Sequence, residues 1–274
     1  MNIKNNRITE QASNYHHLET RSSLELLQLI NDEDAKIAAA VKVTIPMISQ
    51  FIDDFVPKFI AGGRLFYIGA GTSGRLGILD ASEIPPTYGL DYNRVIGIIA
   101  GGDDAIRKAV EFAEDDIEQG WKDLQRLNIN QKDAVVGITA SGTTPYVIGA
   151  VKMAKQHGIM TVGISNNPES TLSKLADYPL EAVVGPEFVT GSTRMKSGTA
   201  QKLILNMIST TLMIRIGKVE DNKMVNMQLS NNKLGDRGAK SLMENLQLDQ
   251  KTAYQLLQQF GSVKEAMSNY KKVK

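Results

Sequence analysis

The sequence predicts an α/β protein with a doubly wound parallel sheet, flanked by helices and followed by a small helical C-terminal domain. Three observations carry this prediction. The 274 residues are 42% hydrophobic, which is enough to bury a substantial core. Short apolar runs alternate with helical patterns, which is typical of a parallel sheet covered on both faces. Residues 231–274 differ, because they carry polar helical segments with no strand pattern between them.

The chain should begin with an arm and two helices. Residues 1–22 are polar and aperiodic, so we expect an arm rather than a packed element. The leucines that follow indicate a helix up to about Ile30. Asn31-Asp-Glu-Asp34 is then typical of the capping sequence of a long apolar-striped helix from about Ala35 to Ile60. Gly62-Gly63 should end that helix.

Later apolar runs predict the strands of the sheet, with helical stretches between most of them. The predicted strands are Leu65–Ile68, Val95–Ala100, Ala134–Thr139, Met160–Ser165 and Leu180–Val184. The segment Lys196–Ile216 follows as a helix so broadly apolar that it should be buried on several sides. It is also a candidate subunit interface.

The tail should be a small helical domain. Its helical segments lie near Asp236–Leu246, Asp249–Phe260 and Ser262–Tyr270. Gly261-Ser262 indicates a helix stop followed by a new N-cap. We therefore divide the chain into an arm (1–22), a sheet domain with its N-terminal helices (23–230) and a helical domain (231–274).

Charge and composition argue against several classes of function. The 31 basic and 30 acidic residues leave a net charge of +1, so no bulk field attracts nucleic acid or an anionic membrane. The chain has no cysteine, and its three histidines, His16, His17 and His157, are too dispersed for an obvious zinc site. We expect no metal and no cofactor, a small-molecule partner, and a cytoplasmic location, since neither a signal peptide nor a spanning apolar run is evident.

The motif Gly69-Ala-Gly-Thr-Ser-Gly-Arg75 follows the first predicted strand and leads into a helical pattern. Thr72, Ser73 and Arg75 supply donors suited to a single phosphate or sugar. The glycine spacing also fits a dinucleotide-binding turn. That alternative requires an acidic residue about 20 positions on, at the end of the second strand, where this chain has Ala100-Gly-Gly102. A tight turn with a purely structural role is the other alternative.

A second hydroxyl-rich turn follows the third predicted strand. Ser141, Thr143 and Thr144 stand before Pro145, a residue suited to the first turn of a helix. Their hydroxyls and nearby backbone amides would converge on one anion. The alternative is an ordinary N-cap, for which Ser and Thr are preferred whatever the function. A cap needs only one such residue, so we favour a binding site. Together the two turns predict one phosphosugar pocket.

A third motif, Gly191-Ser-Thr-Arg-Met-Lys196, precedes the long apolar helix. Arg194 and Lys196 lie near the start of that helix, where positive charges oppose its dipole. An anionic ligand, bound together with Ser192, would explain the arrangement. A pair of cations that serves a contact between subunits would explain it as well.

Two carboxylates are candidates for proton transfer. Glu83 follows the first turn and precedes Pro85-Pro86, which should halt the helix; solvation is the alternative for a single surface glutamate. Glu114 would lie roughly 16 Å from the strand end on a helix that begins near Asp103, at about 1.5 Å per residue. It reaches the pocket only if that helix is broken or a second subunit contributes. His157 stands at a helix C-terminus, and we interpret it as a cap and not as a base.

Taken together, the motifs resemble those of a known family. Their order is similar to that in the N-acetylmuramic acid 6-phosphate etherases, whose fold is the doubly wound, phosphosugar-binding sugar isomerase domain. The resemblance covers roughly residues 24–270. The strings that carry it are Gly69-Ala-Gly-Thr-Ser-Gly-Arg-Leu76, Asp80-Ala-Ser-Glu-Ile-Pro-Pro86, Ala100-Gly-Gly102, Ala113-Glu-Asp115, Ala140-Ser-Gly-Thr-Thr-Pro-Tyr146 and Gly191-Ser-Thr-Arg-Met-Lys196.

The resemblance implies cleavage of the D-lactyl ether of N-acetylmuramic acid 6-phosphate, which gives N-acetylglucosamine 6-phosphate and D-lactate in bacterial cell-wall recycling. It also implies a homodimer, and it carries the family's catalytic roles onto Glu83 and Glu114. One carboxylate would remove the C2 proton beside an aldehyde while the other protonates the departing lactate oxygen at C3. We assign Glu83 as the acid and Glu114 as the base; the sequence leaves the reverse open.

Two departures from the family pattern bear on the structure. Members of the family usually carry a longer N-terminal stretch with an Arg-Asn-Pro element, whereas Leu18-Glu-Thr-Arg21 passes directly to Ser22-Ser-Leu24 in this chain. Glu220-Asp221 replaces the expected Tyr-Gly before Asn222, where a turn should lie.

Other functions of this fold remain alternatives. A non-catalytic phosphosugar sensor is the main one, since related proteins of the fold regulate a sugar kinase; retention of both carboxylates favours an enzyme. A ketose–aldose phosphate isomerase would require a better-placed base than His157. A sugar-responsive DNA-binding regulator would require a basic helix-turn-helix, and the N-terminal helices show no basic recognition face.

Overall fold

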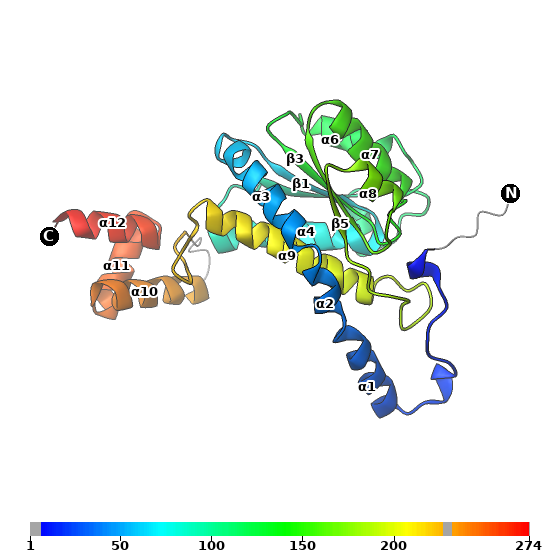
Figure 1. Ribbon diagram of the computed structural model, residues 1–274. Helices are drawn as coiled ribbons and strands as arrows, with labels where there is room; N and C mark the ends of the chain where they lie inside the picture. The colour runs from blue at the N-terminus through cyan, green and yellow to red at the C-terminus, as the bar shows by residue number, and fades with distance from the viewer. Residues whose placement is uncertain (1–6, 227–231, 274) are drawn as a thin grey trace. The chain divides into compact units, whose positions relative to one another are not determined.

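The computed structural model describes residues 7–226 and 232–273 (Figure 1). The described chain forms two compact units. Residues 7–81 and 95–208 make the first unit, and residues 82–94, 209–226 and 232–273 make the second. Two long helices, α4 (Gly71–Tyr88) and α9 (Lys196–Arg215), each contribute residues to both units.

A five-stranded parallel sheet forms the centre of the first unit, in the order β2-β1-β3-β4-β5. The strands are β1 (Leu65–Gly69), β2 (Val95–Ile99), β3 (Ala134–Ile138), β4 (Met160–Ser165) and β5 (Tyr178–Glu181). β1 and β3 are buried along their whole length, as expected of the apolar runs that encode them. The predicted doubly wound α/β class is confirmed, and β5 begins two residues before the predicted strand.

Helices cover both faces of this sheet (Figure 1). One face carries α6 (Gln119–Arg126), α7 (Pro145–Gln156) and α8 (Thr171–Leu175), and the other carries α3 (Ile45–Ile60), α4 and α9. Successive residues of β1 therefore pack against different layers. Phe66 joins the apolar cluster of α6 and α7, whereas Tyr67 lies against Gly77 of α4, where an added Cβ would come within 2.9 Å of the Tyr67 Cβ.

The N-terminal helices are divided differently from the prediction. α1 (Ser23–Asp34) begins with a capping box between Ser22 and Glu25 and contains the residues that we assigned as a cap for the next helix. The predicted single helix from Ala35 to Ile60 is wrong, because α2 (Ile37–Lys42) and α3 are separate. The cause is Pro46, whose ring clashes with the carbonyl of Lys42 in a continuous helix but fits the first turn of a new one.

A second correction concerns α4, which does not stop before Pro85-Pro86. The helix continues to Tyr88, and the amide of Gly89 donates to the Pro85 carbonyl at 2.9 Å. Both prolines lie near the helix end, and the buried side chains of Ile84 and Tyr88 hold that last turn in place. Packing therefore outweighs the hydrogen bonds that the two prolines cannot make.

The described part of the N-terminal arm, residues 7–22, packs against the sheet domain, contrary to expectation, and residues 1–6 of the predicted arm lie outside the described residues. Two short 3₁₀ helices, Ile8–Glu10 and Leu18–Thr20, lie along it. Thr9 is fully buried and forms two hydrogen bonds with Asn167, at 3.3 Å and 2.9 Å. Ser13 donates its hydroxyl to the Phe188 carbonyl. The arm is thus attached to the loops that follow β4 and β5.

The second unit contains a hairpin and a helical cluster. The hairpin pairs β6 (Val219–Glu220) with β7 (Lys223–Met224), and Asp221 in its turn has a φ of +53°, a conformation that glycine adopts more easily. The helices are α10 (Asn232–Leu246), α11 (Gln250–Phe260) and α12 (Val263–Val273), as predicted apart from the earlier start of α10. Gly261 ends α11 with a φ of +73°. Their apolar cluster includes Leu242, Leu257 and Val263.

Within the described residues, no single helix is both long and apolar enough to cross a membrane. One bent pair, Ser23–Lys42 and Ile45–Ile60 at an angle of 50°, reaches that length and composition when its parts are added together.

Candidate active site

The two hydroxyl-rich turns lie side by side at one end of the sheet. β1 and β3 pair in parallel with Gly69 opposite Ile138, so the turns that follow them leave the sheet together. The direction of winding reverses at this point, because β1 has β2 on one side and β3 on the other. Ligands of doubly wound sheets bind at such reversals, outside the carboxyl ends of the strands.

Close packing requires glycine in the first turn. A Cβ on Gly69 would lie 2.7 Å from the amide nitrogen of Gly74, and a Cβ on Gly74 would lie 2.5 Å from Cγ1 of Ile99. Gly71, where α4 begins, has a φ of +52°. The strand thus passes tightly into the helix, and the free amides at a helix N-terminus favour an anion.

The three predicted donors of the first turn have different surroundings. Thr72 lines a cavity of about 370 Å³ between the two turns, which is the larger of two neighbouring cavities. Ser73 lines it too, but is mostly buried and donates its hydroxyl to Oε1 of Gln201 on α9 at 2.9 Å. Arg75 uses its Nε to donate to the Ile106 carbonyl at 2.8 Å and lines a smaller neighbouring cavity. The structure therefore brings Thr72 and Ser73, but not Arg75, to the larger cavity.

The hydroxyls of the second turn bond one another. Oγ1 of Thr139 lies 2.7 Å from Oγ1 of Thr144 and 3.2 Å from Oγ of Ser141. Thr143 donates both its hydroxyl and its amide to the same Ser141 oxygen. Thr144 stands at the N-cap position of α7, yet its side chain makes no capping bond, which argues against the ordinary N-cap alternative. Such a cluster can redirect several donors toward one oxyanion.

Glu114 reaches this end of the sheet because the helix predicted for its segment is broken. α5 (Asp104–Arg107) is short, and residues 108–118 form turns and irregular chain. The amide of Tyr146, in the first turn of α7, donates to the Glu114 carbonyl at 3.0 Å. One of the two conditions predicted for Glu114, a broken helix, is therefore met.

A cavity of about 370 Å³ lies between the two turns. The predicted site residues that line it are Thr72, Ser73, Glu114, Ser141, Thr143 and Thr144. A smaller cavity of about 170 Å³ shares Ala70, Gly71 and Glu114 with it and extends along residues 109–113. The larger cavity thus combines neutral hydroxyl donors with a carboxylate, as acid–base chemistry on a phosphorylated sugar requires.

Glu83 lies elsewhere on α4. It is exposed, and it belongs to the part of this helix that is in the second unit, beginning at Ser82. The cavity is built from residues of the first unit. The role of Glu83 therefore stays a prediction from the family motif.

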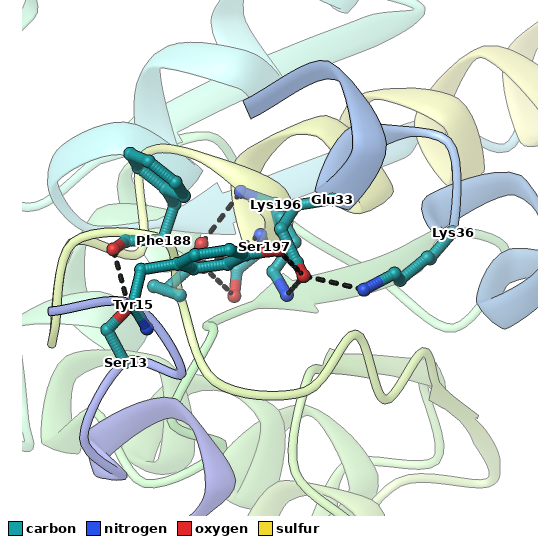
Figure 2. A network of polar contacts seen from close by, with 8 residues as sticks. Ser13, Tyr15, Glu33, Lys36, Phe188, Lys196 and Ser197 are labelled. Carbon is teal, nitrogen blue, oxygen red and sulfur yellow. Dashed lines mark hydrogen bonds and ion pairs between the residues drawn. The ribbon is translucent and has the colours of Figure 1, made fainter. Parts of the chain in front are cut away.

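Lys196 is occupied by a buried ion pair (Figure 2). Its Nζ lies 2.6 Å from Oε2 of Glu33, and the two side chains are 2% and 5% exposed. Lys36 and the Tyr15 hydroxyl also donate to Glu33. Burial alone would raise the pKa of Glu33, but the hydrogen bonds from Lys196, Lys36 and Tyr15 outweigh it and lower the pKa to about 2.

The start of α9 has a second acidic partner. Glu187 accepts hydrogen bonds from the amides of Lys196 and Ser197, each at 2.9 Å, and from the Ser197 hydroxyl. Glu33 therefore compensates the charge of Lys196, which we had explained by a ligand or by a subunit contact, and Glu187 satisfies the free amides at the start of α9. Ser192 and the exposed Arg194 precede α9 without lining the larger cavity, whereas Thr193 between them does line it.

Sequence reasoning missed five polar residues of the cavity wall: Arg7, Glu10, Asp115, Thr139 and Thr193. Asp115 and Thr193 belong to two of the family motifs, where they stand next to the predicted site residues Glu114 and Ser192. Arg7 and Glu10 belong to the arm, which carries no periodic signal that would place it at the sheet. Distant contacts of the arm, chiefly that of Thr9 with Asn167, bring them there.

The fold and the site define a phosphosugar-binding protein of the sugar isomerase class. The chain matches the SIS domain family over residues 106–210 and the family of the glucokinase regulatory protein N-terminal SIS domain over residues 47–155. The solved structure of a phosphoheptose isomerase from Neisseria gonorrhoeae shares the fold, with a TM-score of 0.53 at 17% identity over 70% of this chain and 98% of that one.

Curated relatives identify the family more closely. The N-acetylmuramic acid 6-phosphate etherase of Porphyromonas gingivalis is 58% identical over 265 residues, which is 97% of both chains. That of Bacteroides thetaiotaomicron is 57% identical over 97% of this chain and 96% of its own. The chain belongs to the N-acetylmuramic acid 6-phosphate etherase family. The expected longer N-terminal stretch is not a feature of the P. gingivalis relative, which is matched over nearly its whole length.

Proposed function

We propose that this protein cleaves the D-lactyl ether of N-acetylmuramic acid 6-phosphate, releasing D-lactate and N-acetylglucosamine 6-phosphate in cell-wall sugar recycling. The observation that carries the proposal is the match of 58% identity over 97% of the chain to a curated etherase. The cavity supports it, since Glu114 and both hydroxyl-rich turns line the same space.

The phosphate binds between the two turns. Thr72, Ser141, Thr143 and Thr144 supply hydroxyls, and the N-terminus of α4 supplies backbone amides and a favourable dipole. The reacting carbons of the opened sugar then extend toward Glu114. These hydroxyls can turn their donors toward the phosphate oxygens.

Glu114 acts as the base and Glu83 as the acid. Glu114 takes the C2 proton, which the C1 aldehyde makes acidic, and the C3–O bond to lactate breaks as a C2–C3 double bond forms. Glu83 gives its proton to the departing lactate oxygen. Water then adds across the double bond, with hydroxide at C3 and a proton at C2. Each group contributes about 10²–10⁴-fold to the rate.

The protein acts as a cytoplasmic homodimer with no nucleic-acid or membrane partner. The exposed leucines of α1 support a dimer, since Leu24 and Leu27 are each 66% exposed on one helix. Light scattering at micromolar concentration should give twice the chain mass, and Leu27→Glu should shift the mass toward that of one chain. A monomeric mass for the unmodified protein would exclude this part of the proposal. Cell fractionation tests the location.

A non-catalytic phosphosugar sensor is the second candidate function. The match of residues 47–155 to the glucokinase regulatory protein domain favours it. Such a sensor would bind N-acetylmuramic acid 6-phosphate and release no lactate.

One assay separates the two candidates. Purified protein is incubated with N-acetylmuramic acid 6-phosphate, with and without a chelator, and D-lactate is measured enzymatically beside Glu83→Gln. The etherase proposal expects lactate from the unmodified protein with or without chelator, and a loss of at least about 100-fold in Glu83→Gln. Tight substrate binding without lactate would support the sensor. Full activity in Glu83→Gln would reject the role of Glu83 and leave the activity standing.

A further inference from the structure

The charge of the larger cavity, which lies between the two hydroxyl-rich turns, is unfavourable for the proposed phosphosugar. Glu10, Glu114 and Asp115 line it with three carboxylates, and Arg7 is the only cation among the described residues of its wall. A phosphate monoester carries about −1.5 to −2 charges at pH 7. Binding such a group in a cavity with excess negative charge requires a cation close to it.

The cations that the sequence suggested for this task are placed elsewhere. Lys196 is buried in its ion pair with Glu33. Arg75 donates to the Ile106 carbonyl and lines the smaller cavity. Arg194 is exposed at the start of α9 and is not part of the cavity wall. The requirement therefore falls on Arg7.

Arg7 is held at the cavity by its backbone, while its side chain remains available. The amide of Glu10 donates to the Arg7 carbonyl at 3.1 Å and closes a 3₁₀ turn. Thr9, inside that turn, is fully buried against Asn167. The Arg7 guanidinium has no hydrogen-bond or ion-pair partner within residues 7–226 and 232–273.

The same anchor places Arg7 on the side of the second turn. The Asn167 side-chain amide, which bonds Thr9, also donates to the carbonyls of Ala140 and Ser141. The arm is thus fixed to the backbone that carries the Ser141, Thr143 and Thr144 hydroxyls. A group bound by these hydroxyls therefore shares the cavity with the Arg7 side chain.

We propose that Arg7 binds the phosphate of the phosphosugar and supplies the positive charge that the rest of the cavity lacks. The inference rests on the proposed function for the identity of the sugar. A guanidinium suits the role, because its planar donors match two phosphate oxygens at once and its charge does not titrate at neutral pH. The hydroxyl-rich turn orients the phosphate, and Arg7 offsets part of its negative charge.

The test compares two variants. Arg7→Met removes the charge at similar side-chain length, and Arg7→Lys keeps the charge but loses the planar pair of donors that can bind two phosphate oxygens at once. Arg126→Met is the matched control, because Arg126 is an exposed arginine of α6. For each protein, calorimetry measures the Kd of N-acetylglucosamine 6-phosphate, steady-state lactate release gives kcat and KM, and thermal unfolding gives Tm.

Arg7→Met should raise both this Kd and the KM for the ether by about 10- to 100-fold, as expected for loss of a charge-assisted hydrogen bond. The kcat and Tm should change little, Arg7→Lys should fall between Arg7→Met and the unmodified protein, and Arg126→Met should match the unmodified protein. N-Acetylglucosamine without phosphate should bind Arg7→Met and the unmodified protein equally weakly.

Three results would overturn the inference. A raised KM with an unchanged Kd for N-acetylglucosamine 6-phosphate would place Arg7 on the lactyl carboxylate instead. Unchanged values of both would remove Arg7 from binding, and a lowered Tm without rescue by Arg7→Lys would make its role structural. If the unmodified protein releases no lactate but binds N-acetylglucosamine 6-phosphate through Arg7, the etherase proposal fails and the inference about Arg7 stands.

Discussion

The amide nitrogen of Tyr146 lies 3.0 Å from the carbonyl oxygen of Glu114, and this bond joins the candidate base to the helix that follows the second hydroxyl-rich turn. Tyr146 is fully buried, and its hydroxyl donates to Asp123 of α6 at 2.7 Å. The backbone of Glu114 is therefore fixed from the core while the residue lines the cavity. Proton transfer depends on fixed placement of this kind.

Glu114→Gln should reduce lactate release by about 10²–10⁴-fold, because the amide cannot accept the C2 proton. Exchange of that proton with deuterated solvent, followed by NMR, should be lost as well. The control is Glu111→Gln, on the same loop but lining only the smaller cavity, which should keep most of the activity. Exchange at the normal rate in Glu114→Gln would assign the base to another residue.

Glu33→Gln should destabilise the fold by about 3–5 kcal/mol, because it leaves the buried Lys196 ammonium without its carboxylate. Urea unfolding measures the loss. Glu118→Gln is the matched control, since Glu118 pairs with Lys122 on the surface and such pairs contribute at most about 1 kcal/mol. Equal losses in the two variants would contradict the importance assigned to the buried pair.

The stability of the protein should also depend on Glu33 in acid. Its folded-state pKa is lowered from 4.5 to about 2, so its contribution is fully present above the unfolded value and is lost as the pH falls through that window. A shift of this size corresponds to about 3 kcal/mol. Unfolding free energies measured between pH 6 and pH 3 should fall more steeply for the unmodified protein than for Glu33→Gln. Parallel curves would mean that Glu33 titrates normally.

Gly142→Ala should distort the second turn and weaken phosphosugar binding. Gly142 has a φ of +70°, and a Cβ there would lie 2.2 Å from the Ser170 Cβ. Gly102→Ala is the control, because Gly102 has a φ of +69° with open space around it. It should lose only the backbone cost of about 1–2 kcal/mol, whereas Gly142→Ala should lose more and raise KM. Equal Tm values for the two variants would show that the turn absorbs the added methyl group.

Phe112→Asn should stabilise the protein by about 1 kcal/mol. Phe112 has a φ of +61°, which asparagine tolerates better, and its ring is 82% exposed, so little burial is lost. Phe112→Ala keeps the backbone cost and should show no gain. Chemical denaturation of both variants checks this, and a destabilised Phe112→Asn would mean that the ring contributes more than its exposure indicates.

The sheet and its two turns could be predicted from local sequence, because buried parallel strands are short apolar runs and tight turns need glycine. The break between α2 and α3 could also have been predicted locally, from Pro46. The continuous apolar stripe led us to predict a single helix instead. Pro85-Pro86 led to the opposite error, because we predicted that α4 ends before them. The packing of Ile84 and Tyr88 extends the helix to Tyr88.

What could not be predicted depends on residues far apart in the chain. The position of Lys196 near the start of a helix suggested an anionic ligand. The structure instead pairs Lys196 with Glu33, which lies 163 positions away in the sequence. Arg7 and Glu10 reach the cavity through Thr9 and Asn167. No periodicity in a polar arm signals such a contact, whose energy comes from hydrogen bonds and not from an apolar stripe.

The pairing of Thr9 with Asn167 spans 158 positions, and this sets the earliest point at which the arm can join the cavity during synthesis. Ribosomes add about 5–20 residues per second, so the arm leaves the ribosome roughly 8–30 seconds before the segment that holds it. Until then Arg7 and Glu10 have no docking partner, whereas β1 and the first turn are already made. The nascent chain therefore acquires its hydroxyl-rich turns before the part of the wall that its own N-terminus forms.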